Sequence, residues 1–291
     1  MEIHQLRYAL AVAHDGTFTA AARRLHVAQS GVSAQVARLE RELGTTLFER
    51  GSRAVVPSAA GRVLLPRMRA VLEALDRVED AAAELSGLLT GTVHLGAVAG
   101  LGWAPFLDAL EEVRERYAGL DIFLREGLAA DLQAAVADGR LDVAVVSWAR
   151  EPLASLQSWV AVTERVAAVV PQDHEWATRR SIRPRDLLDV KVICTSHGTG
   201  MRAAYETMMA AERLAAPVAL DVTLPSTARA LVARGLGVGV LTTSHADLPD
   251  DLTRVEIRSH HATSYLGVVW RGSPSAAATV MLETLRRRLA A

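Results

Sequence analysis

The chain has 291 residues, which is enough for two or three domains and too many for one simple core. Half of the residues are hydrophobic and 22% are charged, a balance typical of a folded globular protein and not of a disordered one. The formal net charge of -1 excludes a protein that is basic along its whole length, but it leaves room for a local DNA-binding surface.

The single cysteine and the N-terminal residues further restrict the class of protein. Cys194 is the only cysteine, which excludes an intramolecular disulfide and a cysteine-rich zinc site. Residues 1–16 lack the basic, apolar and cleavage segments of an export signal. No apolar run approaches the ~20 residues needed to span a bilayer. We therefore expect a cytoplasmic protein without membrane association, cofactor or metal.

The first sixty residues have the pattern of a winged helix-turn-helix. Apolar spacing predicts helices over 3–14, 20–25 and 29–43. Thr17 and Thr19 are candidate N-caps for the second helix, and Gly44 is a natural end for the third. Two short helices joined by a three- or four-residue turn form a helix-turn-helix. Extended residues over 47–57 then predict a hairpin-like wing.

Residues 58–89 are predicted to form one long helix with a coiled-coil seam. Its apolar residues alternate spacings of four and three: Leu64, Met68, Val71, Leu75, Val78, Ala82, Leu85 and Leu89. The alternative is that this stripe packs only against the helix's own domain. A regular seam over ~45 Å of helix is longer than one small domain face requires, so we favour dimerisation.

Beyond Thr90 the pattern changes to strands that alternate with helices. Strands are expected over 93–97, 121–125, 141–147, 165–170, 190–195, 218–222 and 237–241, and helices over 104–117, 128–138, 201–213 and 227–234. This alternation predicts an α/β fold with a mainly parallel sheet covered on both faces. About 200 residues of this kind are expected to divide into two lobes.

Several motifs resemble one family. Residues 18–33 (FTAAARRLHVAQSGVS) and 39–50 (LERELGTTLFER) closely resemble the N-terminus of LysR-type transcriptional regulators. Residues 57–61 (PSAAG) match the family's entry to its linker helix. Weaker matches follow in the family's order at 125–127 (REG), 138–145 (DGRLDVAV) and 231–239 (LVARGLGVG).

This resemblance implies a three-part architecture. It consists of a winged helix-turn-helix DNA-binding domain over 1–58, a linker and dimerisation helix over 59–89, and an effector-binding domain over 90–291. The last part would have two lobes like a periplasmic binding protein, one over about 90–161 and 267–291 and the other over about 162–266. The chain would cross between them near Ala161 and return near Leu266. The implied partners are operator DNA, a small-molecule effector, RNA polymerase and further copies of the chain, as a homodimer through 59–89 and a homotetramer.

The reading end of the DNA-binding domain is predicted on the helix over 29–43. In helix-turn-helix proteins the N-terminal end of the second helix meets the base edges. Ser30 and Ser33 lie opposite the apolar stripe of this helix, with Gln29 at its N-terminal rim. Gln29 can hydrogen-bond adenine bidentately, and the serines can contact either partner. The alternative is that Gln29 and Ser30 only cap the helix.

Three further residues are assigned to the DNA interface. Thr19 lies at the start of the first helix of the pair, and Arg50 and Arg53 lie in the wing. Arginines there suit phosphate or minor-groove contacts, which fix register and not sequence. The alternatives are a solvated Arg53 and an Arg50 paired with an acidic neighbour. Family members often carry Arg or Lys at the position of Ala34, so one contact of the family is in doubt here.

Ligand-binding residues are predicted from strand ends. Ligands in open α/β sheets lie at the carboxyl ends of strands, where helix N-termini also offer free amides. Loops of this kind occur at 99–103, 127–128 and 195–200, and by resemblance all three line the cleft between the lobes. The candidate effector-binding residues are Ala99, Gly100, Leu128, Ser147, Ser196, His197, Thr199 and Arg202.

The third loop indicates the chemistry of the effector. Ser196, Thr199 and Arg202 are placed to hold a carboxylate together, with His197 beside them. The alternative is a turn whose hydroxyls cap the following helix. Family members that sense small acids often carry Ser or Thr at the positions of Ala99 and Leu128. Because both are apolar here, with Trp103 and Trp148 expected nearby, we expect an effector with an apolar or aromatic body and one acidic group.

The sequence lacks the signatures of two other classes of protein, enzymes and solute-binding transport proteins. The segment over 196–200 is not a G-x-S-x-G nucleophile elbow, and the glycine run over 235–239 follows a helix and not a strand, so it is no dinucleotide fingerprint. An enzyme is therefore not expected. A solute-binding transport protein would lack residues 1–89 and carry an export signal. The prediction is a transcription regulator.

Overall fold

The computed structural model describes residues 1–50, 55–85, 89–242 and 248–289. The chain divides into two compact units, Met1–Ser86 and Gly87–Ala291. None of the helices in the described ranges combines the length and the hydrophobicity that a membrane span requires.

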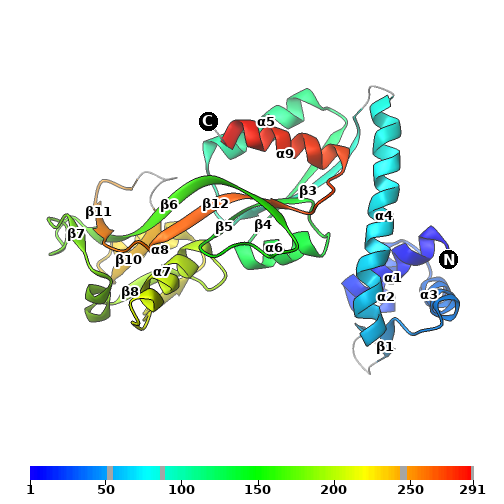
Figure 1. The fold of residues 1–291 in the computed structure, drawn as a ribbon, viewed down its shortest axis with the longest axis horizontal. Coiled ribbons are helices and arrows are strands. Elements are labelled where there is room, and N and C mark those ends of the chain that lie inside the picture. The colour runs from blue at the N-terminus through cyan, green and yellow to red at the C-terminus, as the bar shows by residue number, and fades with distance from the viewer. Residues whose placement is uncertain (51–54, 86–88, 243–247, 290–291) are drawn as a thin grey trace. The chain divides into compact units, whose positions relative to one another are not determined.

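The first unit contains a helical module and a short wing (Figure 1). Its elements are α1 (Ile3–Asp15), α2 (Phe18–Arg24), α3 (Gln29–Leu43), β1 (Phe48–Arg50), β2 (Val55–Pro57) and α4 (Ala59–Leu85). The second helix begins two residues earlier than predicted because Thr17, and not Thr19, is its N-cap. The Thr17 hydroxyl accepts the Ala20 amide at 3.1 Å.

The third helix has the predicted bounds. Val32, Val36 and Leu39 are fully buried along one face, and Gly44 ends the helix in the left-handed region with a φ of 68°. The carboxylate of Glu40 accepts the amides of Leu47 and Phe48, at 2.6 and 3.3 Å. This contact attaches the wing to α3. The wing strands pair antiparallel, and residues 51–54 of the predicted wing lie outside the described residues.

The motif over 57–61 forms the joint between the wing and α4. The Ser58 hydroxyl accepts the Gly61 amide at 2.9 Å and donates to the Thr46 carbonyl at 2.6 Å. A Cβ atom on Gly61 would lie only 2.0 Å from the Leu47 carbonyl oxygen. The motif therefore needs a capping hydroxyl at its second position and no side chain at its fifth.

The apolar stripe of α4 divides along its length. Met68 is buried against the core of its own unit, whereas Val71 and Val78 are 48% and 66% exposed. The stripe was predicted to continue in one helix to Leu89, and this end point was wrong. The described helix spans Ala59–Leu85, residues 86–88 lie outside the described residues, and Leu89 is not helical but packs against a core of the second unit.

The second unit is built on one ten-stranded sheet. Its path is β4-β3-β5-β12-β6-β10-β8-β9, with β11 paired to β6 and β7. The strands are β3 (Gly91–Val98), β4 (Leu120–Gly127), β5 (Val143–Trp148), β6 (Gln157–Pro171), β7 (Ser181–Ile182), β8 (Val192–Thr195), β9 (Leu220–Val222), β10 (Val238–Thr242), β11 (Leu252–Ile257) and β12 (Thr263–Trp270).

The sheet is mixed, where a mainly parallel one was predicted. The pairs β3/β4, β3/β5, β7/β11, β8/β9 and β8/β10 are parallel, but β6 and β12 run antiparallel to their neighbours. The first part of β6 pairs with β12, and its second part pairs with β10 and β11. These two strands therefore join two halves of the unit. The first half contains β3, β4 and β5, and the second half contains β7, β8, β9, β10 and β11. Only 165–170 was predicted within β6, because its first part is largely exposed and lacks a continuous apolar run.

Helices cover both faces of each half (Figure 1). In the first half, α5 (Ala104–Arg116) and α9 (Ala276–Leu289) lie side by side on one face, and α6 (Ala129–Ala137) lies on the other. In the second half, Cys194 of β8 points towards α7 (Gly200–Ala211) and Ile193 towards α8 (Pro225–Val232). Burial on both faces explains why β5 and β8 are apolar runs without alternation. A short 3-10 helix spans Pro184–Asp189.

Candidate functional site

The outer face of α3 presents the predicted reading residues. Gln29 and Ser30 are exposed and Ser33 is partly exposed, opposite the buried stripe. The N-cap position is Ala28, which makes no side-chain capping bond. Among the described residues, no hydrogen bond engages the side chains of Gln29 or Ser30. The capping alternative therefore has no support, and these polar groups are available to a partner.

The remaining DNA-interface candidates are only partly described. Thr19 is exposed in the first turn of α2. Arg50 ends β1, but its side chain and the whole of Arg53 lie outside the described residues. Residues 1–62 contain eight arginines and five acidic residues, so this segment is basic although the whole chain is not. A local positive charge of this kind favours DNA.

The second unit contains a cavity of about 270 Å³ at the carboxyl ends of its strands. Its wall follows β3, β4, β5, β8, β9 and β10, so both halves of the unit contribute. The described lining residues are Val98, Ala99, Gly100, Leu101, Gly102, Trp103, Gly127, Leu128, Ala129, Ser147, Glu164, Thr195, Thr199, Met201, Thr223, Pro225, Ser226, Arg229, Thr242 and Leu266.

Five predicted effector residues belong to this lining, and three do not. The five are Ala99, Gly100, Leu128, Ser147 and Thr199. Trp103 also lines the cavity, whereas Trp148 is buried beside Tyr265, with ring centroids 6.3 Å apart. The structure thus brings the first two predicted loops and part of the third to one cavity.

The N-terminus of α7 contacts the first half of the unit beside this cavity. The Gly200 amide donates to the Ser147 hydroxyl at 3.1 Å, and a Cβ atom on Gly200 would lie 2.6 Å from the Cβ of Ser147. The Ala130 amide donates to the Gly198 carbonyl at 3.2 Å. The loop before α7 is therefore held by strand and helix ends of the other half.

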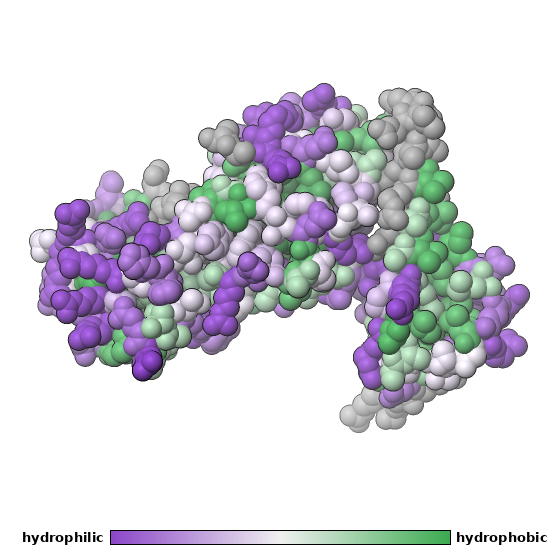
Figure 2. All heavy atoms as spheres, viewed as in Figure 1, coloured by the Kyte–Doolittle hydropathy of each residue, from purple (hydrophilic) through white to green (hydrophobic). Residues whose placement is uncertain are grey.

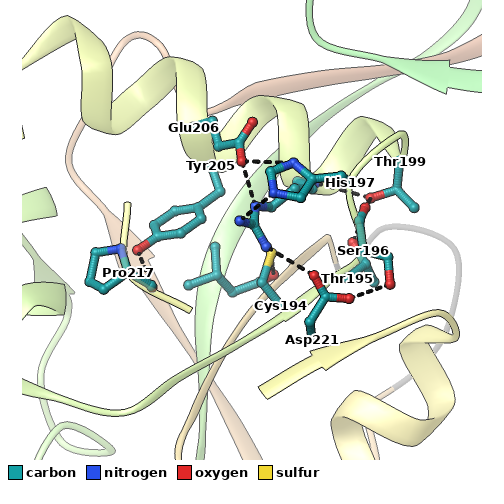
Figure 3. A network of polar contacts seen from close by, with 11 residues as sticks. Cys194, Thr195, Ser196, His197, Thr199, Tyr205, Glu206, Pro217 and Asp221 are labelled. Atoms are coloured by element: carbon teal, nitrogen blue, oxygen red, sulfur yellow. Dashed lines mark hydrogen bonds and ion pairs between the residues drawn. The ribbon is translucent and has the colours of Figure 1, made fainter. Parts of the chain in front are cut away.

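The three predicted residues outside the lining form a polar network (Figure 3). Arg202 Nε lies 2.7 Å from Glu206 Oε1, and its Nη1 lies 3.4 Å from Asp221 Oδ2. Its Nη2 donates to His197 Nε2 at 3.1 Å, and His197 Nδ1 lies 3.2 Å from Glu206. The Ser196 hydroxyl donates to Asp221.

This network explains why Arg202 is absent from the cavity wall. Its side chain is 9% exposed, and its guanidinium is already surrounded by two carboxylates and an imidazole. Thr199 both lines the cavity and caps α7, since its hydroxyl accepts the Arg202 amide at 3.2 Å. The alternative of a capping turn therefore describes part of what this loop does.

Sequence reasoning missed one wall of the cavity. Thr223, Pro225, Ser226 and Arg229 line it from the end of β9 and the start of α8, and buried Glu164 lines it from β6. Among the described lining residues, Arg229 is the one basic side chain and Glu164 the one acidic side chain. The rule used for the other loops, applied to the strand that ends at Val222, would have identified the α8 wall.

Other reactive chemistry is limited in the part of the chain that the structure describes. No group of three or more His, Cys, Asp or Glu residues there could hold a metal ion. Cys194 is fully buried, and its Sγ lies 3.6 Å from the Val240 carbonyl oxygen. Burial raises the pKa of the Cys194 thiol to about 12.

A winged helix-turn-helix joined to an α/β unit with a cavity at its strand ends defines a DNA-binding regulator with a ligand-binding domain. Residues 3–62 match the family model described as bacterial regulatory helix-turn-helix protein, lysR family. Residues 86–290 match the LysR substrate binding domain. The chain belongs to the LysR family of transcriptional regulators, as its motifs predicted, and this family consists of DNA-binding proteins and not enzymes.

Individual relatives agree with this assignment. The chain is 29% identical over 247 residues to the nitrogen assimilation regulatory protein nac of Escherichia coli, a match covering 84% of this chain and 80% of that one. It is 30% identical over 204 residues to the hydrogen peroxide-inducible genes activator of Pectobacterium carotovorum, covering 69% and 67%. A full-length OxyR structure from Pseudomonas aeruginosa shares the fold, with a TM-score of 0.75, 24% identity and coverage of 98% and 95%.

Proposed function

We propose that this regulator reads its operator with the N-terminal face of α3 and is controlled by a small carboxylate with an aromatic or apolar body. The observation that carries the first half is the exposed, uncommitted polar edge formed by Gln29, Ser30 and Ser33. A glutamine amide and two hydroxyls match the donor and acceptor pattern of base edges in the major groove.

Backbone contacts complete the DNA interface. We assign Thr19, Arg50 and Arg53 to phosphates or the minor groove, where they fix the position of α3 without specifying sequence. The excess of arginine over acidic residues in 1–62 supports this assignment. A regulator bound beside a promoter is also placed to contact RNA polymerase, and it acts where the DNA is, in the cytoplasm.

The working form is a homodimer through the helix over 59–89, and two such dimers form the homotetramer. The exposed Val71 and Val78 support this proposal, since they continue the stripe beyond the part that α4 buries in its own unit. Figure 2 shows the resulting hydrophobic surface along the described part of α4. A two-fold dimer predicts an operator with two related half-sites.

The cavity is the proposed effector site. Its volume of about 270 Å³ favours a small molecule, since pockets for drug-sized ligands are typically ~300–1,000 Å³. Trp103, Leu128 and Leu266 supply an apolar wall, and threonine and serine hydroxyls supply polar contacts. Because both halves of the unit line this cavity, a ligand there contacts both and can bias how they sit relative to each other.

A response to hydrogen peroxide is the function suggested by the name of one relative, and in this chain the one thiol that could carry it is Cys194. Cys194 does not suit it, because a reactive cysteine needs a thiolate and access to solvent. This thiol is fully buried and its pKa is raised. We therefore favour effector binding over cysteine oxidation as the control mechanism.

A footprint on the promoter region beside the protein's own gene tests this proposal and gives the operator. Aromatic acids are then added to the complex of protein and operator DNA. In a parallel titration without DNA, the tryptophan fluorescence and thermal stability of the protein are followed. We expect the protein to protect a DNA site with two-fold symmetry. We also expect at least one acid to shift the tryptophan fluorescence and the thermal stability of the protein. No protected site would overturn the regulator assignment. A response to sugars or cations, and to none of the acids, would refute the proposed effector class.

A further inference from the structure

Two arginines lie near the cavity, and the structure separates their roles. Arg202 is committed to Glu206, Asp221 and His197 and does not line the cavity. Arg229 lines the cavity and is only partly buried. Within the described ranges, no hydrogen bond or ion pair engages the Arg229 guanidinium. The cation available to a ligand is therefore on α8 and not on α7.

The surroundings of Arg229 suit one carboxylate. Ser226 lies one helical turn before it, so the two side chains share a face of α8, and Thr223 precedes the helix. The N-cap of α8 is Leu224, which makes no side-chain capping bond. A guanidinium binds a carboxylate bidentately, and hydroxyls beside it donate further hydrogen bonds. The cation and the hydroxyls lie on one wall.

The rest of the described lining directs the remainder of the ligand. Leu101, Trp103 and Leu128 offer apolar surface, and Met201 and Leu266 add to it. Arg229 is the one basic side chain among the described lining residues. A second carboxylate on the ligand would therefore be desolvated in this small cavity without a second cation to compensate its charge.

We infer that Arg229, assisted by Ser226 and Thr223, binds the single carboxylate of a monocarboxylic effector whose apolar body lies against Trp103 and Leu128. This inference rests on the proposed function, because it takes the cavity as the effector site. It replaces Arg202 as the anchor and narrows the effector to monocarboxylates. It also fixes the orientation of the bound molecule, with its acidic end at α8.

Calorimetry on the full-length protein without DNA tests the inference. The probes are benzoate and phenylacetate, their neutral amides benzamide and phenylacetamide, and the dicarboxylate phthalate. They are titrated into the wild type, Arg229→Gln, Arg229→Lys and the control Arg234→Gln. Arg234 is exposed beyond the end of α8 and does not line the cavity. Among the described residues, its guanidinium bonds only the Ala230 carbonyl, at 2.7 Å. Unchanged thermal unfolding of each variant shows that it folds.

At least one monocarboxylate should bind the wild type and Arg234→Gln with equal affinity. Its affinity for Arg229→Gln should be about tenfold to a hundredfold lower, as expected for the loss of a charge-assisted hydrogen bond. Arg229→Lys should retain part of the affinity. Phthalate should bind the wild type at least about tenfold more weakly than benzoate. Equal affinity of the acid for the wild type and Arg229→Gln would overturn the inference, and so would the absence of binding by both acids.

The proposed function fails differently. If the acid binds through Arg229 but leaves the operator complex unchanged in a gel shift, the anchor stands and effector control is refuted. If the operator complex responds to an acid that Arg229→Gln binds as tightly as the wild type, effector control stands and the anchor is refuted.

Discussion

Arg202 and Glu206 lie one turn apart on α7, with Nε 2.7 Å from Oε1, in a network that also holds Asp221 and His197. The Arg202 side chain is only 9% exposed, so its charge requires compensation from neighbouring groups. Two carboxylates supply it. The loop that carries Ser196 and His197 is fixed to the body of its half by the same contacts, and its end at Thr199 forms part of the cavity wall.

We expect Glu206→Ala to lower the free energy of unfolding of the second unit by about 1–3 kcal/mol, because it leaves a buried arginine with fewer partners. Denaturant unfolding followed by tryptophan fluorescence measures this. Glu212→Ala is the control, since Glu212 is exposed at the end of the same helix. Equal losses in the two variants would show that the network adds no stability.

Gly61→Ala should destabilise the first unit and weaken DNA binding. The added methyl would lie 2.0 Å from the Leu47 carbonyl oxygen, so the joint between the wing and α4 must shift. Overpacking of this kind costs about 1–3 kcal/mol. In Gly31→Ala, by contrast, the methyl would meet nothing within 4 Å, and the change should stabilise α3 by up to ~1 kcal/mol. Unfolding free energies in the opposite order would contradict this description of the joint.

Cys194 should be unreactive in the folded protein. Its pKa is raised to about 12 by burial, so the thiolate is scarce at pH 8, and the sulfur is closed to solvent. A disulfide reagent should label Cys194 only when the protein unfolds. Labelling should be immediate in guanidinium and very slow in its absence. Hydrogen peroxide should leave the affinity for DNA unchanged. Fast labelling of the native protein would reopen the thiol-switch function.

Glu112 should make the second unit less stable in acid. Hydrogen bonds from Arg287 and Arg288 hold the pKa of this carboxyl below its ordinary value of 4.5. Because the pKa of Glu112 is lower in the folded state than in the unfolded state, its ion pairs stabilise the fold at pH values above the unfolded-state pKa. This stabilisation is lost as the pH falls through the folded-state pKa. Unfolding curves from pH 7 to 3 measure this. In Glu112→Gln, the fall in stability below about pH 4.5 should be smaller; an unchanged fall would show that the pair is thermodynamically silent.

Local chemistry made α3 predictable. Its buried stripe at Val32, Val36 and Leu39 has helical spacing, and Gly44 supplies the left-handed end. The apolar strands of the second unit were also predictable from local sequence, because each is a short continuous run of apolar residues. In β6, however, the exposed first part carries no such signal, and the strands and helix after residue 250 were not predicted. Antiparallel crossing strands follow from how the two halves join, which no local pattern encodes.

The cavity was predictable where a rule about strand ends applied, and unpredictable where partners were distant in sequence. Ala99 and Leu128 were found by that rule. The contact between Arg202 and Asp221 could not be predicted, because the two residues lie 19 positions apart and only the fold brings them together. Arg229 follows the same rule about strand ends, because it lies on the helix after the short strand that ends at Val222.

The claim that α3 reads the operator is tested most directly by binding titrations of Gln29→Ala on the footprinted operator and on a scrambled fragment. The account predicts a loss of about 1–3 kcal/mol on the operator and little change on the scrambled DNA, because a base contact is removed and phosphate contacts remain. Arg53→Ala, in the same titrations, should weaken binding to both and lower the salt slope by about 1. Unchanged operator affinity in both variants would contradict the account.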